Sequence, residues 1–163
     1  METLITPPLI TGQASAFREA LPHGGLLLGI DTGTKTIGTA ICDAGWRFAT
    51  PAKPIAKGKF MRDKAAIEAI VAERGIAGLV IGLPLNMDGS ESPRSQSARA
   101  YARNLGVLGL PVLLWDERWS TQAAARDLIG QDISRAKRAE RIDSAAAATI
   151  LQAAIDALAG AVL

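Results

Sequence analysis

Three apolar runs without polar alternation stand out along the chain, at residues 26–30, 78–82 and 111–115. Runs of this kind are typical of strands that are covered on both faces of a sheet. Residues 61–74 carry an apolar stripe at helical spacing, and residues 92–105 begin with a serine and a proline that suit the first turn of a helix. Because a helix joins each late strand to the next, we expect parallel pairing through right-handed crossovers.

The segment after the first run alternates in polarity and predicts a hairpin. Residues 32–35 are a turn-forming set, and residues 37–42 place mainly branched side chains at one set of alternate positions and small ones at the other. A face of small side chains lets a helix or another backbone come close. Residues 46–50 alternate again, so a third strand should complete an antiparallel meander.

The C-terminal third is predicted to be helical around a basic segment. One helix should cover residues 120–129 and a last one residues 143–159. Residues 130–142 between them are polar and basic, which favours a mobile loop that becomes ordered on binding. The whole order of elements predicts an α/β fold, RNase H-like, with a mixed five-stranded sheet and helices on both faces.

Length and composition fit one globular domain with a short extension. The chain has 163 residues, of which 48% are hydrophobic and 21% charged, enough for one core. We assign the RNase H-like domain to residues 25–163. Prolines and glycines punctuate residues 1–24, which we expect to be an extension that is partly disordered or a short helix.

Charge and targeting signals narrow the class of protein. The net charge of +2 permits an anionic partner. The single Cys42 lies in a predicted strand, so we expect a buried thiol, no disulfide framework and a reducing compartment. No apolar run reaches membrane-spanning length, and the N-terminus does not resemble a signal peptide. We therefore predict a protein of a reducing compartment without a membrane partner.

Asp31 ends the first apolar run and is followed by the turn rich in Gly and Thr. One interpretation is a turn-opening Asp whose carboxylate accepts a hydrogen bond from the backbone two residues on. A second is the first metal-binding carboxylate of an RNase H-like nuclease. A third is the phosphate-binding hairpin of the actin, Hsp70 and sugar-kinase ATPases, but that site needs two such domains and this chain is long enough for one.

Further acids are predicted to converge on Asp31. Asp116 and Glu117 end the last apolar run, and the carboxyl ends of parallel strands form one ligand-binding edge. If one strand separates them from Asp31, the backbones lie roughly 10 Å apart, at about 4.8 Å per strand. Asp143 is either the N-cap of the last helix or a third acid on the apolar stripe through Ala147.

These acids favour a divalent cation. A carboxylate on an apolar stripe is costly unless a cation neutralises it. Three acids without a cluster of His or Cys suit hard, oxygen-seeking cations, so we predict Mg²⁺ or Mn²⁺ as the cofactor. The matching chemistry is two-metal hydrolysis of a phosphodiester bond.

Four motifs occur in order along the chain: GIDxGxKxIG from residue 29, VIGLPLNMDG from residue 80, DERWST from residue 116 and IDSAA from residue 142. With these motifs the chain resembles the YqgF/RuvX family, the pre-16S rRNA nucleases that are related to Holliday-junction resolvases. The resemblance covers about residues 26–158. It implies an RNase H-like fold, a bacterial cytoplasmic enzyme and a role in maturing the 5′ end of 16S rRNA.

The resemblance also implies roles for individual residues. Carried over, the catalytic acids and metal ligands are Asp31, Glu117 and Asp143. Resolvases of this superfamily usually carry an acid at the end of the strand that matches residues 78–82, but this chain has Gly82 there, followed by Leu and Pro. The acid has in effect moved to Glu117, so the geometry of those resolvases does not transfer directly.

Polar and cationic side chains near these acids are predicted to bind nucleic acid. The set is Lys35, Asn86, Arg94, Arg118, Arg135, Lys137, Arg138 and Arg141. The alternative for cations on a helix is a solvated face, which we favour for Arg99 and Arg103. Aromatic residues make up only 4% of the chain, which favours recognition of backbone and shape over base stacking.

Three functions remain open on the sequence. The first is a metal-dependent endonuclease acting on structured RNA, with pre-rRNA and ribosomal particles as partners. The second is the same chemistry on branched DNA, which requires a dimer with two active sites on a two-fold axis. The third is a non-catalytic RNA-binding factor in ribosome assembly or transcription. The sequence shows no exposed apolar stripe, so we expect a monomer or a weak homodimer.

Overall fold

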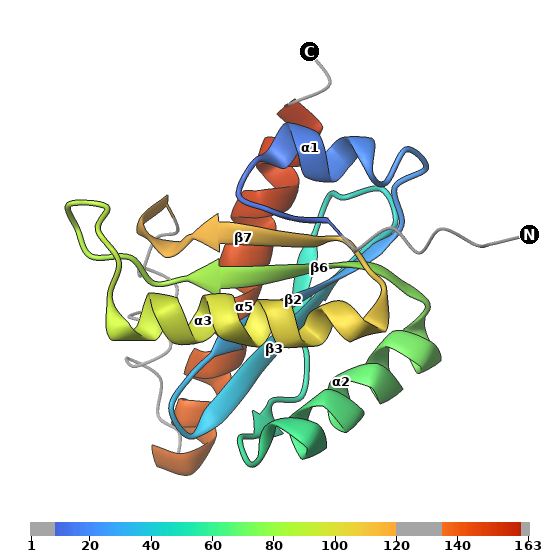
Figure 1. Ribbon diagram of the computed structural model, residues 1–163. Helices are drawn as coiled ribbons and strands as arrows, with labels where there is room; N and C mark the ends of the chain where they lie inside the picture. Colours follow the sequence, from blue (N-terminus) through green and yellow to red (C-terminus); the bar gives the residue numbers. More distant parts are fainter. Residues whose placement is uncertain (1–8, 120–134, 161–163) are drawn as a thin grey trace, which may run out of the picture.

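The computed structural model describes residues 9–119 and 135–160, and the side chains of the second range from Ser144 onward. Along the chain in Figure 1 the regular elements are β1 (Ile10–Thr11), α1 (Ala14–Glu19), β2 (Leu26–Thr32), β3 (Thr36–Cys42), β4 (Ala49–Pro51), β5 (Ile55–Ala56), α2 (Phe60–Arg74), β6 (Ile76–Leu83), α3 (Pro93–Leu105), β7 (Val112–Asp116) and α5 (Arg135–Gly160). Short 3₁₀ turns, η1 (Gly106–Leu108) and η2 (Glu117–Trp119), follow α3 and β7.

One mixed sheet holds these strands in the order β1-β7-β6-β2-β3-β4, with β5 paired to β3. β2, β6 and β7 run parallel, whereas β3 is antiparallel to β2 and to β4. These pairings confirm the predicted meander and crossovers. The sheet has seven strands instead of five because β1 and β5 are two residues long, too short for an alternating pattern to reveal.

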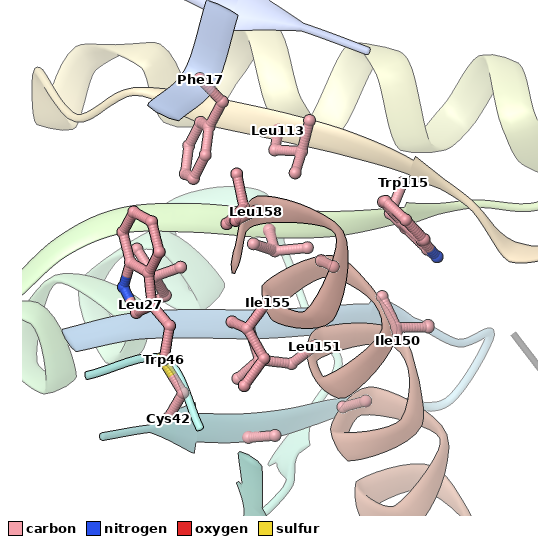
Figure 2. Close-up of a cluster of buried hydrophobic side chains, with 14 residues drawn as sticks. Phe17, Leu27, Cys42, Trp46, Leu113, Trp115, Ile150, Leu151, Ile155 and Leu158 are labelled. Carbon is pink, nitrogen blue, oxygen red and sulfur yellow. The ribbon is translucent and has the colours of Figure 1, made fainter. Parts of the chain in front are cut away.

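Helices cover both faces of the sheet, α5 on one face and α2 and α3 on the other (Figure 1). Leu27 of β2 belongs to a core cluster with α5, and its neighbour Leu28 belongs to a second cluster with α2 and α3. Figure 2 shows the first cluster, in which Leu151 and Ile155 of α5 lie over the strands. Both faces of the central strands are buried, which explains why their sequences are apolar throughout.

The N-terminal segment is packed against this core. β1 pairs in parallel with β7, and Phe17 of α1 is fully buried in the α5 cluster. Nη1 of Arg18 donates a hydrogen bond to the carbonyl of Leu158 at 2.9 Å. The segment thus adds a strand and a short helix to the fold. The division of the chain into an extension and a domain at residue 25 stays a prediction.

The last helix begins at Arg135, well before the predicted start at Asp143. Residues 135–142 consist of good helix formers without Gly or Pro, so this part of the predicted loop continues the helix instead. Asp143 therefore lies inside α5 and is not its N-cap. The predicted helix at residues 120–129 lies outside the described residues.

The third strand begins at Ala49 and not at Trp46. The N–H of Trp46 donates to the carbonyl of Asp43 at 3.1 Å, and its φ of 56° lies in the left-handed region. The indole is buried, and its Nε1 donates to the carbonyl of Gly25 at 2.8 Å. Burial and this hydrogen bond offset the backbone strain, so an aromatic residue that fits a strand pattern stands in a turn.

The burial of Cys42 and the character of the helices can both be compared with the sequence-based expectations. Cys42 is buried, as predicted, and burial raises the pKa of its thiol to about 11. In the part of the chain that the structure describes, no helix has the length and apolar character needed to cross a membrane.

Close contact between α5 and the sheet depends on small residues in the strands. A Cβ atom at Gly29 of β2 would lie 2.9 Å from Cβ of Leu151 and 3.2 Å from the carbonyl oxygen of Ala147. Ala40 and Cys42 of β3 belong to the same cluster. The predicted small face of the hairpin is therefore the face on which α5 lies.

We predict that Gly29→Ala destabilises the protein by about 1–3 kcal/mol, because the added methyl group overpacks the contact with α5. Gly12→Ala is the control, since the nearest atom to a Cβ there is 3.8 Å away. Urea unfolding measures both free energies. Equal stability of the two variants would show that α5 can move outward at little cost.

Candidate active site

Asp31 and Glu117 lie at the same edge of the sheet, with one strand between them. Asp31 stands near the end of β2, and Glu117 follows β7 as the first residue of η2. β6 lies between β2 and β7 and pairs in parallel with both. This is the arrangement expected for acids at the carboxyl ends of parallel strands that one strand separates.

The middle strand carries Gly82 next to Glu117. A Cβ atom at Gly82 would lie 3.1 Å from both Cγ and Cδ of Glu117, and 2.7 Å from Cδ1 of Ile150 in α5. An alanine at this position would therefore crowd the Glu117 side chain, and the end of the Ile150 side chain would have to shift. The bare backbone of Gly82 gives Glu117 the room to lie across β6 and approach Asp31.

The two carboxyl groups interact directly. Burial, and next the negative charge of Asp31, raises the pKa of Glu117 from 4.5 to about 7. A hydrogen bond with the Asp31 side chain and the charge of Asp116 act in the same direction, whereas the positive charge of Arg94 lowers this pKa. Since two carboxylates at short range resist ionising together, the pair retains a proton near neutral pH unless a cation lies between them.

Asp116 has a different role from its neighbour Glu117. Its carboxylate accepts hydrogen bonds from Nε of Arg118 at 3.0 and 3.1 Å, from Nη2 at 2.6 Å and from the backbone N–H at 2.9 Å. These hydrogen bonds with Arg118 lower the pKa of Asp116. Nη1 of Arg118 donates to the carbonyl of Met87 at 3.1 Å. The Asp116–Arg118 pair therefore links η2 to the loop after β6 through the hydrogen bond to Met87. Glu117 is the acid that interacts with Asp31.

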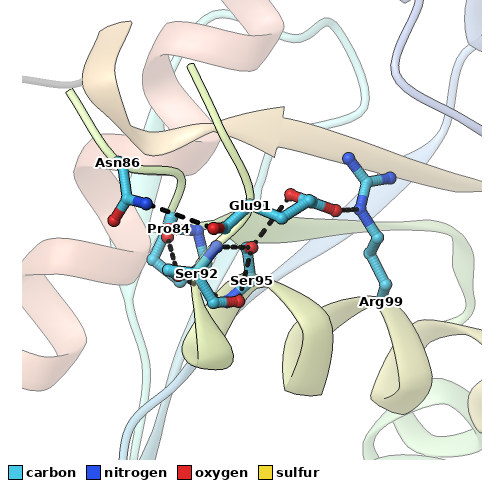
Figure 3. A network of polar contacts seen from close by, with 6 residues as sticks. All are labelled: Pro84, Asn86, Glu91, Ser92, Ser95 and Arg99. Carbon is cyan, nitrogen blue, oxygen red and sulfur yellow. Dashed lines mark hydrogen bonds and ion pairs between the residues drawn. The ribbon is translucent and has the colours of Figure 1, made fainter. Parts of the chain in front are cut away.

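Asn86 stabilises that same loop between β6 and α3 (Figure 3). Its Nδ2 donates to Oγ of Ser90 at 3.0 Å and to the carbonyl of Glu91 at 3.1 Å. At the start of α3, Oγ of Ser92 accepts a hydrogen bond from the N–H of Ser95 at 2.9 Å, which completes the predicted cap. The Asn86 side chain is thus used within the loop, and its contact with nucleic acid stays a prediction.

The remaining predicted residues are placed to different degrees. Lys35 is exposed in the β2–β3 turn, and Arg94 is exposed in the first turn of α3, where its charge acts on Glu117. The others lie in α5, and their side chains are outside the described part: Arg135, Lys137, Arg138, Arg141 and Asp143. Among the described side chains, no group of three acids, His or Cys could hold a metal ion. Asp31 and Glu117 are thus the part of the predicted acid triad that can be placed.

Sequence reasoning missed what Gly82 does. The resemblance to resolvases predicts an acid at this strand end, and the glycine found there instead was interpreted only as the absence of that acid. In the structure a Cβ atom at Gly82 would crowd the Glu117 side chain, so a side chain at this position and Glu117 compete for the same space. The signal was therefore the combination of an absent acid on β6 and an added acid after β7.

A model of the RuvX family, described as Holliday junction resolvase, matches residues 25–157. The chain belongs to the RuvX family. A relative from Novosphingobium aromaticivorans is 71% identical over 152 residues, which cover 93% of this chain and 98% of that one. A relative from Sphingopyxis alaskensis is 65% identical and covers 92% of this chain and 99% of its own. Both carry the name "Putative pre-16S rRNA nuclease".

Solved structures support the RNase H-like fold. Thermus thermophilus RuvC in complex with a Holliday junction substrate superposes with a TM-score of 0.53 at 15% identity, covering 84% of this chain and 97% of that one. A second structure of Thermus thermophilus RuvC gives a TM-score of 0.52 at 15% identity. At this identity the likeness concerns the fold, and it agrees with the mixed sheet and two helical layers described above.

The raised pKa of Glu117 predicts how stability depends on pH when no metal is present. Between about pH 4.5 and 7 the folded state binds a proton at Glu117 that the unfolded state has released, so this residue's contribution to stability falls as pH rises. With EDTA present, Glu117→Gln should therefore gain stability relative to wild type as pH rises from 5 to 8. Thermal melts across this range measure the difference.

The exposed Glu73, changed to Gln, is the matched control for that experiment and should give a flat difference. A flat difference for Glu117→Gln as well would mean that Glu117 does not lie against Asp31 in solution.

Proposed function

We propose that this RuvX-family protein is a cytoplasmic nuclease that hydrolyses phosphodiester bonds in the 5′-end maturation of pre-16S rRNA. The observation that carries the proposal is the approach of Glu117 to Asp31 across Gly82, at the carboxyl edge of parallel strands. Relatives that are 71% and 65% identical over nearly the whole chain bear the name of that nuclease. Identity at this level makes a shared activity the simplest reading.

The donor chemistry of the pair fits a divalent cation. Asp31 and Glu117 offer only oxygen atoms. Burial, and next the negative charge of Asp31, raises the pKa of Glu117, and a cation between the two carboxylates would relieve their repulsion. We assign Mg²⁺ or Mn²⁺ to this position, with Asp143 as the third ligand. Such a cation supplies Lewis acidity and lowers the pKa of bound water.

Asp143 is included because of its place on α5. It lies one turn before Ala147, which is fully buried in the cluster between α5 and the sheet. Residues four apart share a helix face. By this spacing we assign Asp143 to the face of α5 that packs against β2 and β6. On the sheet, α5 contacts the side toward which Cβ atoms at Gly29 and Gly82 would point.

The chain's own groups account for binding and orientation. Arg94 stands close enough to Glu117 to influence its ionisation, so its guanidinium can hold a phosphate oxygen next to the acids. Lys35 extends from the turn that follows Asp31. Arg135, Lys137, Arg138 and Arg141 precede Asp143 on α5, and we assign them to the phosphate backbone further along the substrate. Asn86 and Arg118 act through the loop that they stabilise.

Branched DNA is the second candidate substrate, because the family model is described as Holliday junction resolvase. A resolvase cuts two strands symmetrically and needs two sites on a two-fold axis. We propose a monomer or a weak dimer, so precursor rRNA, free or within ribosomal particles, is the favoured substrate. A tight dimer at low micromolar concentration, measured by light scattering, would favour the junction instead.

Incubation with end-labelled precursor rRNA and with a four-way DNA junction, each with Mg²⁺, Mn²⁺ or EDTA, tests the proposal. Cation-dependent cleavage of the rRNA at a defined position is the expected result. Cleavage of the junction alone would move the substrate to DNA. Binding of the rRNA without any cleavage would support a non-catalytic assembly factor.

We predict that Asp31→Asn abolishes cleavage while nucleic-acid binding is kept or strengthened. Asn can form the same turn hydrogen bond, but it lacks the charge that holds a cation and that repels phosphate. The variant should also lose the rise in melting temperature that Mg²⁺ or Mn²⁺ gives the wild type. Full metal-dependent activity of Asp31→Asn would leave Asp31 as a turn residue only.

We predict that Gly82→Ala lowers kcat by about 10²-fold with little change in KM, because its methyl group displaces the Glu117 carboxylate from Asp31. Gly29→Ala is the matched control, since it strains the packing of the same helix, at Leu151 and Ala147 instead of Ile150, without touching Glu117. If both variants lose activity equally, the effect comes from α5 and Gly82 has no positioning role.

A further inference from the structure

A small pocket lies beside the two acids. It measures about 170 Å³ and is lined by the β2–β3 turn, the segment after β5 and the first turns of α3: Thr32, Gly33, Thr34, Lys57, Pro93, Arg94, Ser97 and Tyr101. Thr32, the last residue of β2, lines the pocket and directly follows Asp31, so the pocket adjoins Asp31 along the chain. Pockets for drug-sized ligands measure roughly 300–1,000 Å³, so this one suits a small group.

The chemistry of the lining suits an anion. It contains two positively charged side chains, those of Lys57 and Arg94, and no carboxylate. Thr32, Thr34 and Ser97 add hydroxyl groups from two different elements. Ammonium and guanidinium groups together with hydroxyls are the donors from which phosphate oxygens accept hydrogen bonds.

Lys57 is held in position toward this pocket. Its Nζ donates a hydrogen bond to the carbonyl of Gly33 at 3.1 Å, and its backbone N–H donates to the carbonyl of Lys35 at 3.0 Å. An ammonium group has three donors, so two remain for a ligand. These two bonds join the segment after β5 to the turn that follows Asp31.

Tyr101 forms a fixed part of the wall. Its side chain is only 8% exposed, and its ring meets that of Phe60 edge to face, with centroids 5.3 Å apart. Burial and the nearby charge of Asp63 raise the pKa of its hydroxyl, so it stays protonated. The hydroxyl is buried and interacts with Asp63, so Tyr101 shapes the pocket wall and leaves the contacts with an anion to the other lining residues.

The pocket adjoins the acids through β2. Arg94 lines it from the first turn of α3, and Thr32, the residue after Asp31, lines it from the end of β2. A phosphate in the pocket would therefore lie beside the carboxylates and not on them. Such a position corresponds to a phosphate that flanks the one being cleaved.

We propose that this pocket binds a phosphate of the substrate strand that flanks the scissile phosphate, with Lys57 and Arg94 as the cationic ligands. The inference rests on the proposed nuclease function and adds Lys57, Ser97 and Tyr101 to the substrate site. A second phosphate held at a fixed distance sets the register of the strand against Asp31 and Glu117.

Binding of short precursor-rRNA duplexes by proteins that carry Asp31→Asn, and so bind without cleaving, tests the proposal. Each duplex has a single uncharged methylphosphonate at one successive position of the strand. With Lys57 present, one position beside the cleavage site should weaken binding about tenfold, as expected for a charge-assisted contact. With Lys57→Ala added, that position should weaken binding by a clearly smaller factor, because only the Arg94 contact remains to be lost, and the salt dependence should flatten by about one phosphate.

Lys59→Ala is the matched control, because Lys59 is exposed two residues further along and does not line the pocket. It should keep the full methylphosphonate effect. Equal responses of Lys57→Ala and Lys59→Ala would overturn the proposal by reducing Lys57 to general charge. The proposal would also be overturned if, in the protein that keeps Lys57, no methylphosphonate position flanking the cleavage site weakened binding. That result does not depend on the folding of any Lys57 variant.

The terminal phosphate of an RNA end has the same chemistry and is tested in parallel. Duplexes with a 5′-phosphate or a 5′-hydroxyl should bind alike if the pocket holds an internal phosphate, and a preference for the 5′-phosphate that Lys57→Ala removes would overturn the internal assignment. Failure of wild-type protein to cleave rRNA, with the methylphosphonate effect intact, would refute the nuclease function alone. Cleavage without that effect would refute the pocket alone.

Discussion

The site depends on an empty position in the middle of three parallel strands. Asp31 and Glu117 stand at the ends of β2 and β7, the strands on either side of β6. Because neighbouring strands are about 4.8 Å apart, the backbones of the two residues cannot approach each other. Only the side chains can close the distance, and they must do so over β6. Gly82 makes that possible, because any side chain there would take the space of Glu117 and press on Ile150 of α5. One absent side chain thus serves both the acid pair and the packing of α5.

Holding Glu117 close to Asp31 has an electrostatic cost, which is confined to this edge of the sheet. Placing Glu117 partly buried beside Asp31 favours its neutral form, which is the physical meaning of its raised pKa. The adjacent Asp116 would add a third negative charge, but Arg118 neutralises it with several hydrogen bonds. Two apolar clusters, one on each face of the sheet, stabilise the fold and so offset the repulsion between Asp31 and Glu117. A cation at the pair would turn the same repulsion into affinity.

The sequence predicts the acid pair well and the surrounding detail less well. Apolar runs that end on Asp31 and Glu117, joined by helices, are enough to infer parallel strands whose ends meet. The polar and basic composition of residues 130–142 predicts a mobile loop, whereas the helix propensity of residues 135–142 extends α5 to Arg135. Trp46 was placed in a strand because alternation does not reveal a left-handed turn. Lys57 carried no signal at all, since its place beside Gly33 follows from the pairing of β3 with the two-residue β5.

The β2–β3 turn links the acids to the proposed phosphate pocket. Asp31 precedes it, Gly33 accepts the hydrogen bond from Lys57, and Thr32 and Thr34 line the pocket. A Cβ at Gly33 would lie 2.5 Å from the carbonyl oxygen of Thr36, so the turn closes tightly and leaves little freedom for its neighbours. The cations of the pocket therefore come from α3 and the segment after β5, and the carboxylates come from β2 and η2. A tight turn that contacts both groups fixes the spacing between them, and that spacing is what a regular phosphate backbone requires.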